Sequence, residues 1–237
     1  MATTFTTAVL IFFIVLTYPH FKDDSTLINK RHILQLLKVC FPLFAGCSLA
    51  FYIENAPKYA IDRLLNDEAQ ACYGFIAMPV FVIGLLNNFI FSPMIAKMSL
   101  LWSEGSTKEF LKLFKLQILI IAGITVMCEI GAYILRIPVL SLLYNTNLET
   151  YKGELLVLLL GEGLLALSGL LVTIMTILRI QNSQAIGYAI IAILAYILSP
   201  VFVQKYAVMG ASILYLLLMM LLCVIFGGVL TIQIKRD

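Results

Sequence analysis

The chain has 237 residues, of which 62% are hydrophobic and 12% are charged, and its mean hydropathy is +1.01. Soluble domains are about 45–50% apolar and about 25% charged, so a soluble fold of this length could not bury the apolar surface. The composition therefore indicates a protein whose solvent is the lipid bilayer. The net charge of +3 does not indicate a nucleic-acid partner, because the basic residues are spread over the polar segments between apolar runs.

Seven apolar runs follow one another along the chain, at residues 2–19, 33–53, 71–96, 113–135, 154–178, 184–203 and 207–232. Most reach the roughly 17–25 residues that a membrane-spanning helix needs. The first run has neither a preceding basic residue nor a small-residue cleavage site, so it is not interpreted as a signal peptide. No run alternates with a period of two, which argues against a membrane β-barrel. The prediction is an all-α, polytopic helix bundle of about seven transmembrane helices in the cytoplasmic membrane.

The distribution of basic residues predicts the orientation of the helices. The odd-numbered polar segments and the C-terminal tail hold 11 of the 16 Lys and Arg residues, and the even-numbered segments hold 5. Cytoplasmic segments carry the excess of Lys and Arg in membrane proteins. We therefore expect the N-terminus outside and the C-terminus in the cytoplasm.

The sequence shows no pattern typical of a metal site or a catalytic centre. Its five cysteines form no C-x-x-C pair and are predicted to be small buried apolar side chains. His20 and His32 lie in one polar segment without acidic residues at ligand spacing. The longest polar segments have only about 15–20 residues, so a membrane-embedded enzyme is disfavoured. We expect no catalytic residue, no metal and no cofactor.

The segment 54–70 is rich in charges of both signs. Asn55 is suited to the N-cap of a helix and Pro57 to its first turn. Three apolar residues then share one helical face: Ile61, Leu64 and Leu65. The pattern predicts a short amphipathic helix on the outer membrane surface.

Three stretches resemble a known family. The first is "FPLFAGCSLAFYIENAPKYAIDRLL", with a proline near the start of a span and an "NAPKYAID" turn. The others are "IPVLSLLYNTNLETYKGELLVLLLGEG" and "ILRIQNSQAIGYAIIAILAYILSPVFVQKYAVMGASILYL", which contains a Tyr-x-x-x-Gly-Ala turn. Together they resemble the oligosaccharide flippases of the MOP superfamily over residues 27–236. Asn145 after Tyr144 departs from the glycine that is frequent in that family.

The resemblance implies a fold of two six-helix bundles around a central cavity, with both termini cytoplasmic. Seven spans with the N-terminus outside fit the last span of the first bundle, residues 1–19, followed by the C-terminal six-helix bundle, residues 20–237. The implied function is half of an exporter that moves a lipid-linked oligosaccharide across the membrane by alternating access. Its implied partners are membrane lipids and either a missing N-terminal bundle or a second copy. A cation-coupled, MATE-like drug exporter and an inactive fragment are the alternatives.

Polar residues inside the apolar runs are candidate functional residues, because charged groups in hydrocarbon are costly and usually have a function. Glu129 and Glu162 are placed at similar depth in the outer half of the membrane, where they are suited to ion coupling or to local hydrogen bonding. Asn87 and Asn88 lie in the middle of the third run. They are candidates for a surface that binds substrate or a neighbouring helix.

Basic residues at the inner ends of spans form a second candidate group. They are Lys38, Lys97 and Arg179. A lipid diphosphate requires cationic partners, and Arg provides bidentate contacts. The alternative interpretation is that these residues only orient the helices and extend their charges to the membrane surface.

The orientation predicts the outcome of cysteine labelling in a background that lacks the five native cysteines. A cysteine at position 103 should be shielded from a membrane-impermeant thiol reagent in intact cells. A cysteine at position 146 should be labelled, because the fourth polar segment is predicted to face outward. The reverse labelling pattern would contradict both the orientation and the proposed alignment with a second bundle.

Overall fold

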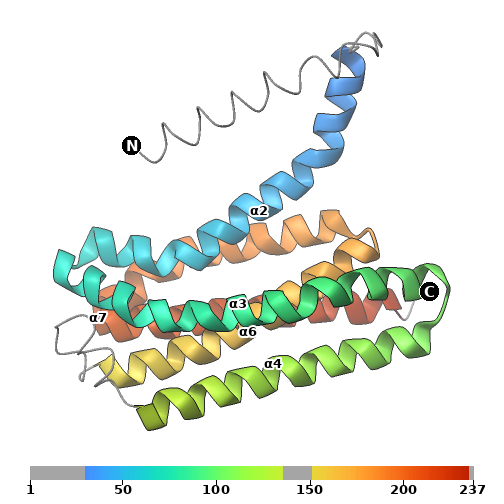
Figure 1. Cartoon of the computed structure of the whole chain (residues 1–237). Helices are drawn as coiled ribbons and strands as arrows, with labels where there is room; N and C mark the ends of the chain where they lie inside the picture. Colours follow the sequence, from blue (N-terminus) through green and yellow to red (C-terminus); the bar gives the residue numbers. More distant parts are fainter. Residues whose placement is uncertain (1–29, 136–150, 235–237) are drawn as a thin grey trace, which may run out of the picture. The chain divides into compact units, whose positions relative to one another are not determined.

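The computed structural model describes residues 30–135 and 151–234, which contain five helices and no strand. Their bounds are α2 Lys30–Leu64, α3 Asp67–Ser103, α4 Thr107–Leu135, α6 Lys152–Ile177 and α7 Gln181–Ile234 (Figure 1). The chain divides into two compact units, Met1–Phe41 and Pro42–Asp237. The second unit contains all five described helices, apart from the first residues of α2.

Four of the described helices are long and apolar enough to cross a membrane. They are α3, α4, α6 and α7. The prediction of an all-α protein embedded in a membrane is therefore confirmed for the described residues. The predicted span at residues 2–19 lies outside the described residues. The structure does not test the expected total of about seven spans or the orientation of the termini, so both stay predictions. The run at 33–53 lies within α2, which is not among the four.

Helix α7 reverses its direction at Ala207. With 54 residues, a straight helix would be about 81 Å long at 1.5 Å per residue, far more than a hydrocarbon core of about 30 Å. Ala207 has the non-helical angles φ 48° and ψ −128°. The ring of Tyr188, before the reversal, meets that of Phe226, after it, edge to face at 5.0 Å. The two segments therefore run antiparallel, as Figure 1 shows in orange and red.

A tight turn joins α3 to α4. Gly105 has φ 72°, the left-handed conformation that lacks a steric cost only for glycine. The amide of Ser106 donates to the carbonyl of Leu101 at 3.0 Å, and that of Gly105 donates to Trp102 at 3.1 Å. This pair of bonds satisfies carbonyls at the end of α3. The ring of Trp102 then packs against Phe110 of α4, with 5.4 Å between centroids.

The predicted surface helix at 54–70 is wrong. Helix α2 continues to Leu64, and Asn55 lies inside it, where its side-chain amide donates to the carbonyl of Phe51 at 2.9 Å. The cap is instead Asn66, whose side chain accepts from the amide of Ala69 at 3.0 Å and starts α3. The helix continues because one face stays buried across the polar segment. The residues of that face are Ile53, Ala56, Ala60 and Ile61.

The reversal in α7 predicts a strong effect of substituting Gly210. A Cβ atom there would overlap the backbone carbonyl oxygen of Phe202, which cannot move without distorting the turn. Gly210→Ala should therefore lower the free energy of unfolding by about 3 kcal/mol. The measurement is SDS-induced unfolding in mixed micelles.

Gly228→Ala is the matched control for this substitution. It lies in the same helix, and a Cβ there meets nothing within 4 Å, so alanine should be neutral or stabilising by up to about 1 kcal/mol. Equal stabilities for the two variants would contradict the close approach of Gly210 to Phe202.

Candidate functional site

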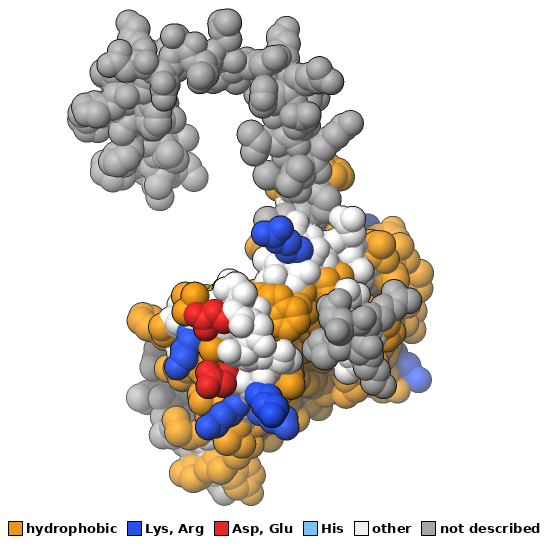
Figure 2. Space-filling model, turned by 90° about the vertical axis from the view of Figure 1, so that its right-hand side faces the viewer, with side chains coloured by type: hydrophobic (Ala, Val, Ile, Leu, Met, Phe, Trp, Pro, Cys, Tyr) orange, Lys and Arg blue, Asp and Glu red, His pale blue; other side chains and the backbone are white. Residues whose placement is uncertain are grey.

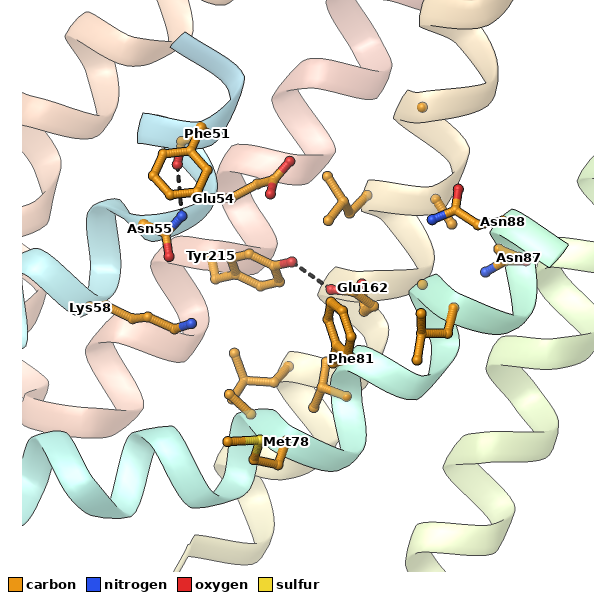
Figure 3. Close-up of a pocket in the computed structure, with 18 of the residues that line it drawn as sticks. Phe51, Glu54, Asn55, Lys58, Met78, Phe81, Asn87, Asn88, Glu162 and Tyr215 are labelled. Atoms are coloured by element: carbon orange, nitrogen blue, oxygen red, sulfur yellow. Dashed lines mark hydrogen bonds between the residues drawn. The ribbon is translucent and has the colours of Figure 1, made fainter. Parts of the chain in front are cut away.

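A cavity of about 850 Å³ lies within the unit Pro42–Asp237. Helices α2, α3 and α6 line it, together with one residue of α7 (Figure 3). Its polar lining residues are Glu54, Asn55, Lys58, Gln70, Tyr73, Asn87, Asn88, Glu162, Thr173 and Tyr215. Three phenylalanines also line it: Phe51, Phe81 and Phe91. This half-open cavity, with many polar groups between apolar helices, is the candidate functional site.

The central polar contact joins α6 to α7. The hydroxyl of Tyr215 donates to a carboxyl oxygen of Glu162 at 2.8 Å, and Figure 3 shows this bond at the middle of the cavity. Glu162 is 9% exposed and Tyr215 is 6% exposed. A hydrogen bond to a carboxyl group is stronger in such surroundings than in water, and leaving either partner without it is correspondingly costly. The contact therefore fixes the carboxyl group in the cavity wall.

Glycines around Glu162 let three other helices approach α6. A Cβ at Gly161 would lie 2.5 Å from the Tyr215 ring of α7, and one at Gly163 would lie 2.5 Å from the hydroxyl of Thr125 in α4. On α3, a Cβ at Gly84 would lie 2.7 Å from the other Glu162 oxygen. Consecutive residues of α6 thus face α7, α3 and α4 in turn. The "LGEGL" sequence packs α6 at the centre of the bundle and presents its carboxyl group to the cavity.

Helix α2 contributes two charged residues to the cavity, Glu54 and Lys58. They are four residues apart and therefore lie on the same side of the helix, and both line the cavity. In Figure 3 they lie on one side of Glu162, and Asn87 and Asn88 lie on the other. Among the described lining residues, the charged groups are two carboxyls, on Glu54 and Glu162, and one ammonium, on Lys58.

Asn87 has an amide group without a partner. The residue is 2% exposed, and within the described residues neither its side-chain nitrogen nor its oxygen has a hydrogen-bond partner. Burying such a group without a partner costs about 1–3 kcal/mol. Because Asn87 lines the cavity, its unpaired amide is a candidate contact for a molecule that enters it. Its neighbour Asn88 also lines the cavity but is exposed.

The structure brings together three of the predicted site residues, namely Asn87, Asn88 and Glu162. Glu129 lies in α4 and does not line this cavity. One of its carboxyl oxygens is buried without a partner among the described residues. The two predicted intramembrane acids are therefore in different surroundings, and the second carboxyl of the cavity is Glu54 rather than Glu129.

Two of the predicted cationic residues, Lys97 and Arg179, do not line the cavity. Lys38 belongs to α2, and its side chain is outside the described part of the structure. Lys97 lies in a separate groove between α3 and α4. Arg179 forms the turn between α6 and α7 with φ 60°, a conformation that costs a residue with a side chain about 1–2 kcal/mol. Their predicted contact with a diphosphate stays a prediction.

Glu54, Lys58 and Tyr215 were missed from the sequence. The first two fell in the segment interpreted as a surface helix, although their spacing of four placed them on one face. Tyr215 lies in an apolar run, where a tyrosine is indistinguishable from other large side chains until a partner for its hydroxyl is known.

No group of three or more His, Cys, Asp or Glu residues that could hold a metal ion occurs in residues 30–135 and 151–234. No protein-family model, curated protein or solved structure matches the chain. The resemblance to the oligosaccharide flippases therefore depends on the quoted sequence stretches alone.

The contact between Glu162 and Tyr215 predicts a loss of stability in Tyr215→Phe. The substitution removes the donor and leaves a buried carboxyl without its partner, which should cost about 1–3 kcal/mol. Tyr196→Phe is the control, because Tyr196 lies in the same helix and is 66% exposed, and it should change stability by less than about 0.5 kcal/mol. The measurement is SDS-induced unfolding. Equal stabilities would show that the hydrogen bond contributes nothing.

Proposed function

We propose that the chain is the C-terminal half of a membrane transporter that moves a lipid-linked oligosaccharide across the cytoplasmic membrane by alternating access. The observation that carries the proposal is the half-open cavity of about 850 Å³ between apolar helices. Amide, carboxyl and hydroxyl groups in its wall match the hydrogen-bonding groups of sugars, and phenylalanine rings provide apolar faces for them. Asn87 supports the assignment most directly, because it lines the cavity and neither atom of its buried amide has a hydrogen-bond partner among the described residues.

The proposal includes the membrane topology. The five described helices provide six helical segments, because α7 reverses at Ala207, and six segments are what one bundle requires. We propose that these belong to a bundle at residues 20–237, that residues 1–19 span the membrane as the last helix of another bundle, and that the C-terminus is cytoplasmic. A separate N-terminal bundle or a second copy would form the opposite wall of the transport path.

The cavity lining contains a cationic residue that was not among those predicted to contact the substrate. Lys58 is the ammonium group among the described lining residues, whereas Lys97 and Arg179 lie elsewhere. We therefore assign the contact with the phosphate of the substrate to Lys58. As a point charge, an ammonium binds phosphate without the bidentate geometry of Arg.

A cation-coupled exporter is the second candidate. The specific observation in its favour is the excess of carboxyl groups in the cavity, where Glu54 and Glu162 accompany one lysine. Carboxyl groups in a membrane interior commonly carry protons or bind cations during transport. Efflux of ethidium that is lost in Glu162→Gln, without any export of glycan, would favour this candidate.

Complementation tests the proposal. Expressed with an N-terminal bundle, the chain should restore glycan export to a strain that lacks its flippase, and expressed alone it should not. Export by the chain alone would contradict the half-transporter and indicate a homodimer. No export in either case, with the chain present in the membrane fraction, would contradict the transport function and indicate an inactive fragment.

Asn87→Leu should separate binding from stability. Replacing an unpartnered buried amide by an apolar side chain of similar size should leave the protein equally stable or more stable by about 1 kcal/mol. Export in the complementation assay should nevertheless fall about tenfold, because one hydrogen-bonded contact is worth about 1.4 kcal/mol.

Gln117→Leu is the matched control for this variant. Gln117 is also fully buried without a partner for its side-chain amide among the described residues, but it lies in α4 outside the cavity lining. It should show the same stability effect with unchanged export. Normal export by Asn87→Leu would exclude the amide from substrate binding.

A further inference from the structure

A second recess lies between α3 and α4, close to the turn that joins the two helices. It has a volume of about 550 Å³ and contains charged and apolar residues of both helices. Its lining includes Lys97, Glu109, Lys112, Lys115, Leu116 and Leu119. We call this recess the α3–α4 groove. None of its residues lines the larger cavity, so it is a separate site.

The groove spans a boundary between polar and apolar surface. The first turns of α4 contain Lys108, Glu109, Lys112 and Lys115, and from Leu116 the helix has no charged residue until Glu129. Figure 2 shows the end of the bundle at which α3 turns into α4, where charged side chains of both signs gather beside apolar ones. Such a change from charged to apolar residues along a spanning helix marks the level of the lipid headgroups.

The charges of the groove favour an anionic group. Lys97 from α3 and Lys112 and Lys115 from α4 supply three ammonium groups, against the single carboxyl of Glu109. The net charge of these residues is about +2 at neutral pH. An ammonium is a common partner of phosphate oxygens, with three donors that rotate freely.

The apolar half of the groove continues on the outer surface of α4. Leu116 is 44% exposed and Leu119 is 70% exposed, and both follow the lysines toward the middle of the span. A ligand that fills the groove therefore needs a negative headgroup and an attached hydrocarbon chain. A soluble anion or an acidic peptide matches only the charged half.

We propose that the α3–α4 groove binds an anionic phospholipid, with its phosphate between Lys97, Lys112 and Lys115 and an acyl chain along Leu116 and Leu119. Basic recesses between transmembrane helices are suited to anionic headgroups. The site is independent of the proposed transport function, since it needs neither the larger cavity nor a second bundle. It also gives Lys97 a role other than contact with a transported diphosphate.

Trp102 provides a direct probe of this site. It is the only tryptophan of the chain. In the sequence it directly follows Leu101, which lines the groove, and its ring packs against Phe110 of α4. The protein is reconstituted in vesicles of phosphatidylcholine with increasing brominated phosphatidylglycerol, and Trp102 fluorescence is recorded. The reverse titration with brominated phosphatidylcholine gives the preference between the two lipids.

We expect the groove to prefer phosphatidylglycerol over phosphatidylcholine about 25-fold. Each of the two net positive charges should contribute a factor of roughly five. In the variant with Lys97, Lys112 and Lys115 replaced by Gln, the preference should disappear. With the same residues replaced by Arg it should persist, because the charges remain and the helices keep their orientation. Glu109→Gln should increase the preference about fivefold.

The matched control replaces Arg63, Lys152 and Lys205 by Gln, which removes the same charge at other positions. This variant should retain the preference measured at Trp102. Equal quenching by both lipids in the unmodified protein would overturn the proposal. So would a preference that survives the three groove substitutions, or one that 10 mM inorganic phosphate abolishes at constant ionic strength, since that would indicate a site for a free anion.

Discussion

The placement of a carboxyl group in the middle of an apolar bundle is the constraint on which the rest of the structure depends. Glu162 lies in the central helix α6, accepts a hydrogen bond from Tyr215, and is enclosed because Gly161 and Gly163 let α7 and α4 approach. An acid in such surroundings is tolerated only with a polar partner or access to water. The bond to α7 and the adjoining cavity provide both. Packing and the candidate site thus meet at one residue, since Gly161 brings α6 close to α7, and these two helices carry Glu162 and Tyr215 in the cavity wall.

The cavity itself combines satisfied and unsatisfied polar groups. Tyr215 and Glu162 satisfy one another, whereas the amide of Asn87 is buried with neither atom paired among the described residues. A protein that only had to be stable would gain by an apolar residue at this position, because an unpaired buried amide costs more than it contributes. The retained amide is therefore understandable as a group that is satisfied by a ligand. The α3–α4 groove has a different character, because its three lysines, Lys97, Lys112 and Lys115, are exposed rather than buried.

Sequence reasoning predicted the helices, the membrane environment and part of the site, for physical reasons that differ between residues. Apolar runs of spanning length define helices without reference to the fold, and Asn87 and Glu162 were identifiable because polar groups are costly within such runs. Asn55 was wrongly assigned as a cap, because capping rules consider one turn, whereas the burial of Ile53 and Ile61 keeps α2 helical across the segment. Tyr215 was missed because its role depends on a partner 53 residues away. The left-handed conformation of Arg179 could not be predicted from the sequence either, because glycine is the residue that usually indicates this conformation.

The reversal at Ala207 also determines how the protein fits the thickness of its membrane. Each segment of α7, at residues 181–206 and 208–234, is about 40 Å long at 1.5 Å per residue, whereas the hydrocarbon core is about 30 Å thick. Segments that are longer than the core tilt or extend into the headgroups, and either adjustment costs fractions of a kcal/mol per ångström. Because the second segment carries Tyr215 into the cavity wall, a change in its tilt moves that wall. We therefore expect the thickness of the surrounding bilayer, which differs between membranes of different lipid composition, to affect the width of the cavity.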